Sequence, residues 1–259
     1  AEALTIDNLA EFDNSNDSDM LFTAASSSAP KFLTVESGSE LFVFATSTFA
    51  PGGDVTLNAN AAANGYDGTL FIADNAAFVG SGTSTYTIGG RMELGAGSSF
   101  AAASSTVLFT ATTTGKSVTA PSEITFNDIS FIGAGGGWNV GADMVVLGDL
   151  VIDAGTVTGT GDITIPFGSM TGDGVLSLGA GTTTIASTNT LGGNGDWSFY
   201  NLQLGDTFAV GTTTPVFTST TTVSGRLTIA VAHYLDAGNL QLNLSGIGNV
   251  FVEDGTFLE

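Results

Sequence analysis

Residues 148–155 read Gly-Asp-Leu-Val-Ile-Asp-Ala-Gly, and this stretch decides the fold. A glycine precedes an apolar–any–apolar phrase, so that Leu150 and Ile152 point to one side of an extended chain and Val151 to the other. The phrase occurs nine times, and besides Leu150 its copies begin at Leu41, Leu70, Met92, Ile129, Leu176, Leu202, Leu227 and Val250. Neighbouring copies begin 21 to 37 residues apart. One short strand recurring at such a period is typical of a solenoid.

The residues around these phrases indicate the class of fold. Glycine and β-branched residues are abundant, and no twelve-residue window carries apolar residues at helical spacing. An antiparallel sandwich would show hairpin turns roughly every 8 to 12 residues, and the period of the phrase is too long for that. We therefore expect an all-β, single-domain parallel β-helix (β-solenoid) of about nine coils. At about 4.8 Å per coil, nine coils make a rod of roughly 40 Å.

The repeat predicts one elongated domain over residues 35–259. Residues 1–34 differ from it and contain an acidic run at 13–19. An open end of a repeat array exposes unpaired strand edges, so this segment is expected to be an N-terminal cap or a docking segment for a neighbouring subunit. A leader without fixed structure is the remaining alternative.

Composition excludes several classes of function. The formal net charge is −21, with only four basic residues, which disfavours binding to nucleic acid or to an anionic membrane surface. There is no cysteine, hence no disulfide and no thiolate ligand. No apolar run reaches 18 residues, so membrane insertion is not expected.

The acidic run is the one candidate for a metal site. Asp13, Ser15, Asp17 and Asp19 place oxygen ligands at alternating positions, which suits calcium. The run lacks the glycine and the glutamate of an EF-hand loop, so the choice lies between a loose calcium site and a solvated acidic loop. No other cofactor is expected.

The residues that could serve in catalysis are few, and we expect that the protein is not an enzyme. Asp128 and Asp149 each precede the inward-facing pair of neighbouring coils, which predicts that they stack one coil apart, with Arg91 beside Asp128 in the same column. Together with Asp153 they would be the best carboxylates for a hydrolase, and a polar ladder on the outer surface is the alternative that we favour. His233, the only histidine, has an apolar neighbourhood and no triad partner in the sequence.

Apolar residues at outward positions indicate a contact surface. Phe42, Phe71, Val151 and Phe251 lie between inward-facing residues. We expect Phe42 and Phe71 near one end, and the last phrase, Val250, Phe251 and Val252, at the other, to be assembly contacts between copies. Alternatively, these faces are covered by the N-terminal segment and by residues 101–123, the longest interval without the phrase.

The Gly-x-Leu-x-Ile type of phrase and the Thr/Ser/Gly-rich turns across residues 35–259 resemble the β-helical passenger and stalk regions of bacterial or archaeal cell-surface adhesins and extracellular filament proteins. This resemblance implies an extracellular, acidic repeat protein with a structural role. The expected function is a self-assembling cell-surface filament subunit or an adhesin stalk, whose copies stack head to tail. Surface glycans are the second kind of partner considered.

Two alternatives remain open. A carbohydrate-binding or polysaccharide-cleaving β-helix would need a groove lined by residues such as Trp138, Trp197 and Tyr200 together with carboxylates. An ice- or mineral-binding surface would need the Thr-x-Thr steps, for example Thr156/Thr158 and Thr182/Thr184, to align in one array, and their positions relative to the phrase predict that they are scattered.

Overall fold

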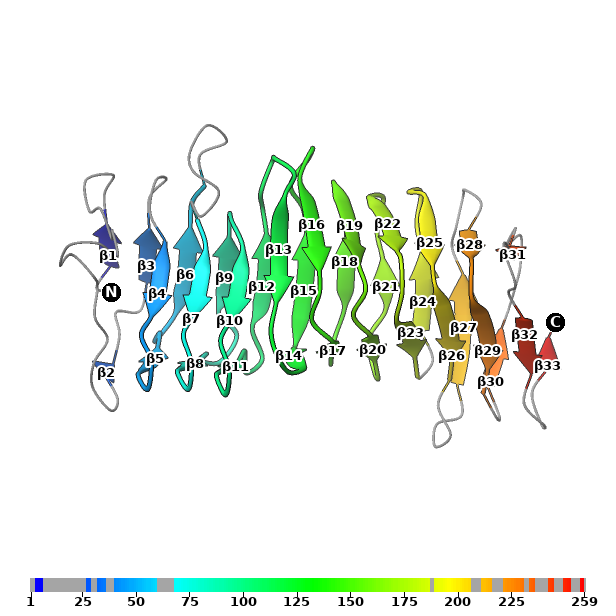
Figure 1. Cartoon of the computed structure of the whole chain (residues 1–259), viewed down its shortest axis with the longest axis horizontal. Helices are drawn as coiled ribbons and strands as arrows, with labels where there is room; N and C mark the ends of the chain where they lie inside the picture. Colours follow the sequence, from blue (N-terminus) through cyan, green and yellow to red (C-terminus); the bar gives the residue numbers. More distant parts are fainter. Residues whose placement is uncertain are drawn as a thin grey trace.

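The computed structural model describes the backbone of residues 3–6, 27–28, 32–35, 40–59, 68–186, 189–205, 211–215, 221–230, 233–235, 242–244, 249–252 and 257–258. Side-chain burial is defined for residues 33–35, 40–59, 68–186, 189–205 and 221–230. Over these residues the chain is a stack of short strands with no helix. The coils follow one another along the long axis of the molecule from the N-terminus to the C-terminus (Figure 1). The all-β parallel solenoid expected from the sequence is confirmed.

Three parallel sheets run along the stack, and we call them sheets A, B and C. Sheet A consists of β1 (Ala3–Ile6), β3 (Phe32–Val35), β6 (Asp54–Leu57), β9 (Thr85–Ile88), β12 (Thr106–Phe109), β15 (Asp128–Phe131), β18 (Leu150–Ile152), β21 (Met170–Thr171), β24 (Asn189–Gly192), β27 (Gly211–Pro215), β30 (His233–Leu235) and β33 (Phe257–Leu258). Sheet B consists of β2 (Ser27–Ser28), β5 (Thr48–Ala50), β8 (Ala77–Val79), β11 (Ser99–Ala101), β14 (Ile124–Phe126), β17 (Met144–Val146), β20 (Ile163–Ile165), β23 (Thr182–Ile185), β26 (Asn201–Leu204), β29 (Arg226–Ile229) and β32 (Asn249–Val252). Sheet C consists of β4 (Leu41–Val43), β7 (Leu70–Ile72), β10 (Met92–Leu94), β13 (Lys116–Thr119), β16 (Gly137–Val140), β19 (Thr156–Gly159), β22 (Val175–Leu178), β25 (Trp197–Phe199), β28 (Thr221–Val223) and β31 (Leu242–Leu244).

Each coil contributes one strand to sheet C, then one to sheet B, then one to sheet A. The recurring phrase therefore marks coils, but not always the same side of them. Its copies at Leu41, Leu70 and Met92 lie on sheet C, whereas those at Ile129 and Leu150 lie on sheet A. All three sheets need the same inward–outward–inward alternation, so the phrase changes sheet along the chain and its spacing varies.

Residues 101–123, the longest interval without the phrase, are part of the repeat. They hold β12 and β13 and thus belong to a regular coil, in which β12 pairs with β9 and β15. At the N-terminal end of the chain, β1 pairs in parallel with β3, and β2 pairs in parallel with β5. Parts of residues 1–34 therefore extend sheets A and B, while the domain boundary at residue 34 stays a prediction.

The interior is a continuous column of apolar side chains. The outward residue of each strand alternates with buried ones, as in β18, where Leu150 and Ile152 are buried and Val151 is half-buried. In the middle coils the rings of Phe109 and Phe131 stack with their centroids 4.9 Å apart, and Trp138 packs against Phe131 at 5.2 Å. Large side chains placed one above another fill the narrow interior without voids.

Glycine corners make room for these large side chains where sheet A turns into sheet C. Gly155 has φ +77°, and a Cβ built on it would lie 2.7 Å from the carbonyl oxygens of both Gly133 and Gly136 and 3.1 Å from the Trp138 ring. Only glycine combines this backbone conformation with so close an approach of two coils. The glycine-rich run at 133–137 is thus a packing requirement of the corner.

Candidate functional site

Some of the residues expected to act lie outside the described part of the structure. The candidate calcium ligands Asp13, Ser15, Asp17 and Asp19 are among them. His233 and the residues of β32 (Val250, Phe251 and Val252) are described by their backbone alone, with β30 paired to β27 and β32 paired to β29. The roles expected for these residues therefore stay predictions.

The carboxylates of the middle coils form a hydrogen-bonded ladder. The Oδ1 atom of Asp128 accepts the backbone N–H of Asp149 at 2.8 Å, and Oδ1 of Asp149 accepts the N–H of Ser169 in the next coil at 2.8 Å. The hydroxyl of Ser169 accepts the N–H of Thr190 at 3.2 Å. We call Asp128, Asp149, Ser169 and Thr190 the sheet A ladder. It confirms the expected stacking of Asp128 on Asp149.

A second ladder, the sheet B ladder, consists of Asp143, Asp162, Thr182, Asn201 and Arg226. Asp143 accepts the N–H of Asp162 at 2.8 Å, and Asp162 accepts that of Thr182 at 2.6 Å. Further along, Asn201 Oδ1 accepts the N–H of Arg226 at 2.9 Å. The residues at or directly before the start of β17, β20 and β26 thus each accept a backbone N–H of the following coil.

Most aspartates of the described coils serve in this way. Of the nine whose side chains the structure describes, seven accept a backbone N–H from the following coil; they are Asp54, Asp74, Asp128, Asp143, Asp149, Asp162 and Asp173. Asp128 uses its second oxygen as well, since Oδ2 accepts a hydrogen bond from Asn127 Nδ2 at 2.7 Å. The sequence reasoning missed this role, although the signal, an Asp or Asn directly before an inward-facing pair, was present.

The expected neighbourhood of Asp128 was wrong in one respect. Arg91 precedes β10 of sheet C, whereas Asp128 opens β15 of sheet A, so the two residues lie on different sheets. Arg91 Nη1 lies 3.6 Å from Glu93 Oε1 instead. Within the described part of the chain, no three His, Cys, Asp or Glu side chains are grouped so that they could hold a metal ion.

The two tryptophans present no ring to the surface. Trp138 and Trp197 are each 1% exposed and point into the core, and the indole N–H of Trp197 donates to the Gly174 carbonyl oxygen at 3.1 Å. Trp197 borders a shallow hollow between β22 and β25, but its buried indole offers no face on which a sugar could stack. Tyr200, by contrast, is exposed. Both tryptophan rings thus belong to the core, and the alternation Trp138–Asn139–Val140 already carried the inward signal.

The outward phenylalanines near the N-terminal end stack on each other. Phe42 of β4 and Phe71 of β7 are neighbours in register, with ring centroids 4.6 Å apart and the planes inclined by 16°. The exposed ring of Phe44 lies 5.3 Å from that of Phe42. Among the described strands, β4 is the edge of sheet C. This aromatic patch (Phe42, Phe44 and Phe71) thus lies on the outer face at the last described strand of sheet C.

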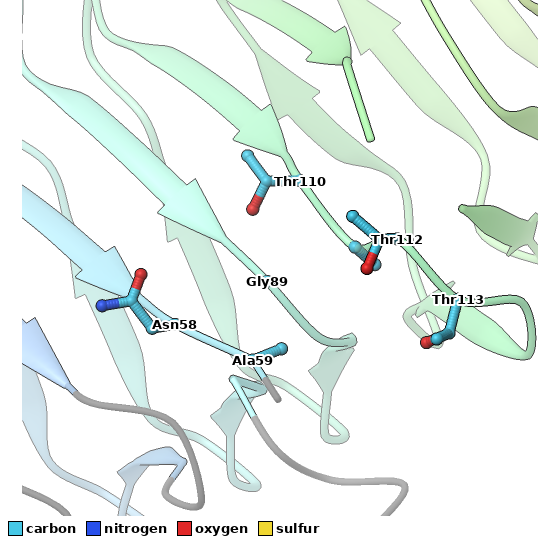
Figure 2. A pocket seen from close by; sticks show the side chains of 7 residues that line it. Asn58, Ala59, Gly89, Thr110, Thr112 and Thr113 are labelled. Atoms are coloured by element: carbon cyan, nitrogen blue, oxygen red, sulfur yellow. The ribbon is translucent and has the colours of Figure 1, made fainter. Parts of the chain in front are cut away.

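A polar notch is cut into the corner between sheets A and C (Figure 2). Its volume is about 110 Å³, and it is lined by Asn58, Ala59, Gly89, Thr110, Ala111, Thr112 and Thr113. Three successive corners form it, because the N–H of Gly89 donates to the Leu57 carbonyl oxygen at 2.8 Å and that of Thr110 donates to Ile88 at 3.0 Å. No pattern in the sequence indicated this notch.

Comparison with known protein families, with characterised proteins and with solved structures gives no match for this chain. Among the described residues, no helix is long and apolar enough to cross a membrane. The fold and the surface features above are therefore what any proposal on function rests on.

Proposed function

We propose that this chain is a non-catalytic structural module of an extracellular, cell-surface assembly, either a filament subunit or an adhesin stalk, whose copies stack head to tail. The observation that carries the proposal is the continuity of the three sheets. Every strand pairing described is parallel, and the outermost described strands are β1, β2 and β4 at one end and β31, β32 and β33 at the other. The two ends thus carry the same three sheets.

An edge strand presents a row of N–H and C=O groups that favours pairing with another chain. A second copy placed on the C-terminal end continues sheets A, B and C without a change of strand direction. Such a contact joins two different surfaces, so it leads to an open filament rather than to a closed dimer. Proteins that avoid this outcome protect their edges with charge, bulges or a covering element.

The aromatic patch supports a contact at the N-terminal end. Phe42 and Phe71 bury part of each ring against the other, and Phe44 adds an exposed ring beside them. At the opposite end, Phe251 occupies the register position of Thr228 on sheet B. An apolar outer surface close to an end is where an incoming copy gains the most from burial.

The carboxylate ladders support a structural role over a catalytic one. Asp128 and Asp149, the best candidates for a hydrolase pair, each spend an oxygen on a backbone N–H of the following coil. An ice- or mineral-binding surface finds no support either, because Thr156 and Thr158 belong to sheet C, whereas Thr182 and Thr184 belong to sheet B.

Electron microscopy of the purified chain by negative staining, with and without calcium, tests the proposal. We expect filaments with an axial repeat close to one rod length, about 50 Å for the ten described strands of sheet C at about 4.8 Å each. The variants Phe42→Ser and Phe251→Ser should shorten or abolish them. Phe167→Ser is the matched control, because Phe167 is 74% exposed at a corner between β20 and β21, in the middle of the stack.

Single rods at high protein concentration, with calcium and without it, would remove the head-to-tail proposal. Loss of filaments in the Phe167 variant alone would instead indicate lateral contacts between rods. Filaments that form with calcium and disappear on its removal would direct attention to Asp13, Ser15, Asp17 and Asp19.

A further inference from the structure

We propose that the polar notch at the corner between sheets A and C binds a neutral, hydroxyl-rich ligand, namely one ring of a neutral glycan. The proposal is independent of the head-to-tail stacking of copies. It rests on the shape of the notch, on the chemistry of its lining and on the hydrogen bonds that its threonine hydroxyls leave unmade.

Three successive corners give the notch its shape. Asn58 and Ala59 follow β6, residues 89–91 lie between β9 and β10, and residues 110–115 join β12 to β13. The corner at Gly89 lies between the other two. Figure 2 shows Gly89 between Asn58 and Ala59 on one side and the threonines on the other.

Glycine at the floor is a requirement of the backbone packing. A Cβ built on Gly89 would lie 2.6 Å from the Ala59 nitrogen and 2.7 Å from the Leu57 carbonyl oxygen. No side chain can be placed there without displacing the backbone of the preceding coil. The hollow between Asn58 and Thr110 is thus built into the corner and does not depend on the rotamer of one side chain.

The lining carries no charge, although the chain as a whole has a formal net charge of −21. With no cation in its lining the notch has no charged group to hold an anion, and with no carboxylate there it lacks the ligands of a divalent cation. Its polar side chains are one amide and three hydroxyls, from Asn58, Thr110, Thr112 and Thr113. Groups that both donate and accept hydrogen bonds match the hydroxyls of a neutral sugar.

The threonine hydroxyls are available for such bonds. None of the hydroxyls of Thr110, Thr112 and Thr113 forms a hydrogen bond with another described residue, while the backbone beneath them is already paired, as in Thr110 N–H to Ile88 and Gly137 N–H to the Thr113 carbonyl oxygen. Three hydroxyls from one turn therefore face the same hollow with their bonding capacity unused.

The volume of the notch limits the size of the ligand that it can hold. About 110 Å³ corresponds to three or four waters at roughly 30 Å³ each. It is well below the roughly 300–1,000 Å³ of a pocket that encloses a drug-sized ligand. One edge of a pyranose ring, with two or three hydroxyls, fits this space, and the rest of a glycan would lie outside. A few neutral hydrogen bonds of this kind predict a Kd on the order of millimolar.

Titration of the ¹⁵N-labelled full chain with the methyl glycosides of glucose, mannose and galactose tests the proposal by heteronuclear NMR. We expect saturable shifts of the Gly89 and Thr110–Thr113 amides with at least one of them. Thr112→Val and Thr113→Val remove a hydroxyl at nearly constant shape, and each should raise the Kd about two- to tenfold. Thr125→Val, an exposed threonine on sheet B, is the control and should leave the Kd unchanged. Glucuronate should bind more weakly than glucose, because the protein is strongly acidic.

Two results would overturn the proposal. One is the absence of saturable shifts with all three glycosides up to about 50 mM, well above the expected Kd. The other is binding whose shifts lie away from the notch, or whose Kd is the same in the valine variants as in the native chain. The spectrum of each valine variant reports at the same time that the variant is folded.

Discussion

Replacing Gly155 with alanine tests the close stacking of the corners more directly than any other change in this chain. Two penalties add at this position. The backbone has φ +77°, a left-handed conformation that costs a residue with a Cβ about 1–2 kcal/mol. The new Cβ also lies 2.7 Å from two carbonyl oxygens, those of Gly133 and Gly136, and 3.1 Å from the Trp138 ring.

The second penalty is one of overpacking. Carbonyl oxygens of a neighbouring coil cannot rotate away as the end of a long side chain can, so the coils must separate locally. Overpacking of this kind typically costs about 1–3 kcal/mol. We therefore expect Gly155→Ala to lower the free energy of unfolding by about 2–5 kcal/mol in total.

Gly115 supplies the matched control. It also precedes a strand of sheet C and has φ +81°, but a Cβ on it would meet nothing within 4 Å. Gly115→Ala should thus show the conformational penalty alone, about 1–2 kcal/mol. The entropy that alanine removes from the unfolded chain is the same at both sites, so the difference of about 1–3 kcal/mol isolates the crowding.

Urea unfolding, followed by tryptophan fluorescence and by circular dichroism, measures both variants. The two signals should coincide, because a stack of coils can unfold in parts and a single free energy then loses its meaning. Equal losses of stability in the two alanine variants would refute the reasoning. So would a Gly155→Ala protein whose stability lies within about 0.5 kcal/mol of the native chain.

Three further predictions concern the ladders, the core and the surface. Asp162→Ala removes the acceptor of the Thr182 N–H, so hydrogen exchange of that amide, measured by NMR, should become about two- to tenfold faster. Asp162→Asn keeps Oδ1, and the exchange rate should stay near that of the native chain. Equal exchange rates in the two variants would contradict the ladder. Trp197→Phe should destabilise the fold by about 1 kcal/mol more than Trp138→Phe in urea unfolding. The reason is that the indole N–H of Trp197 donates to the Gly174 carbonyl oxygen, whereas that of Trp138 has no acceptor among the described residues. A larger loss of stability in Trp138→Phe would contradict this assignment of the hydrogen bond's contribution. Phe167→Ser should change the thermal unfolding midpoint little, by the equivalent of at most about 0.5 kcal/mol, since the ring is 74% exposed, and a large shift would show that the ring is packed against the solenoid.

The alternation of inward and outward residues made the architecture predictable. Leu150 and Ile152 are buried with Val151 between them, as the phrase required, and the stacking of Asp128 on Asp149 followed from their shared position before it. The side of the coil was not predictable in the same way. Three sheets with identical alternation give one strand no local feature that distinguishes it, so Arg91 was placed beside Asp128 although their strands belong to different sheets.

The candidate sites were harder to predict for a physical reason. The polar notch is formed by residues of three corners that are neighbours in space and lie about twenty to thirty residues apart in the chain, and no single motif records that they meet. The carbohydrate alternative needed Trp138 in a groove, although the alternation of Trp138 with Val140 placed it inside. The position of Asp162 before an inward-facing pair was visible in the sequence, but its partner, the Thr182 N–H, could be named only once the register of sheet B was known.

The hydrogen bonds of the ladders all run in the same direction along the chain, and this bears on the order in which the coils fold. Each carboxylate described above accepts an N–H that lies further along the chain, as from Asp143 to Asp162 and from Asp162 to Thr182. During synthesis the amino-terminal coils are completed first, and their acceptors stand ready before the donors have been made. A finished coil is therefore a template on which the next one is laid down, with no contact required beyond one coil.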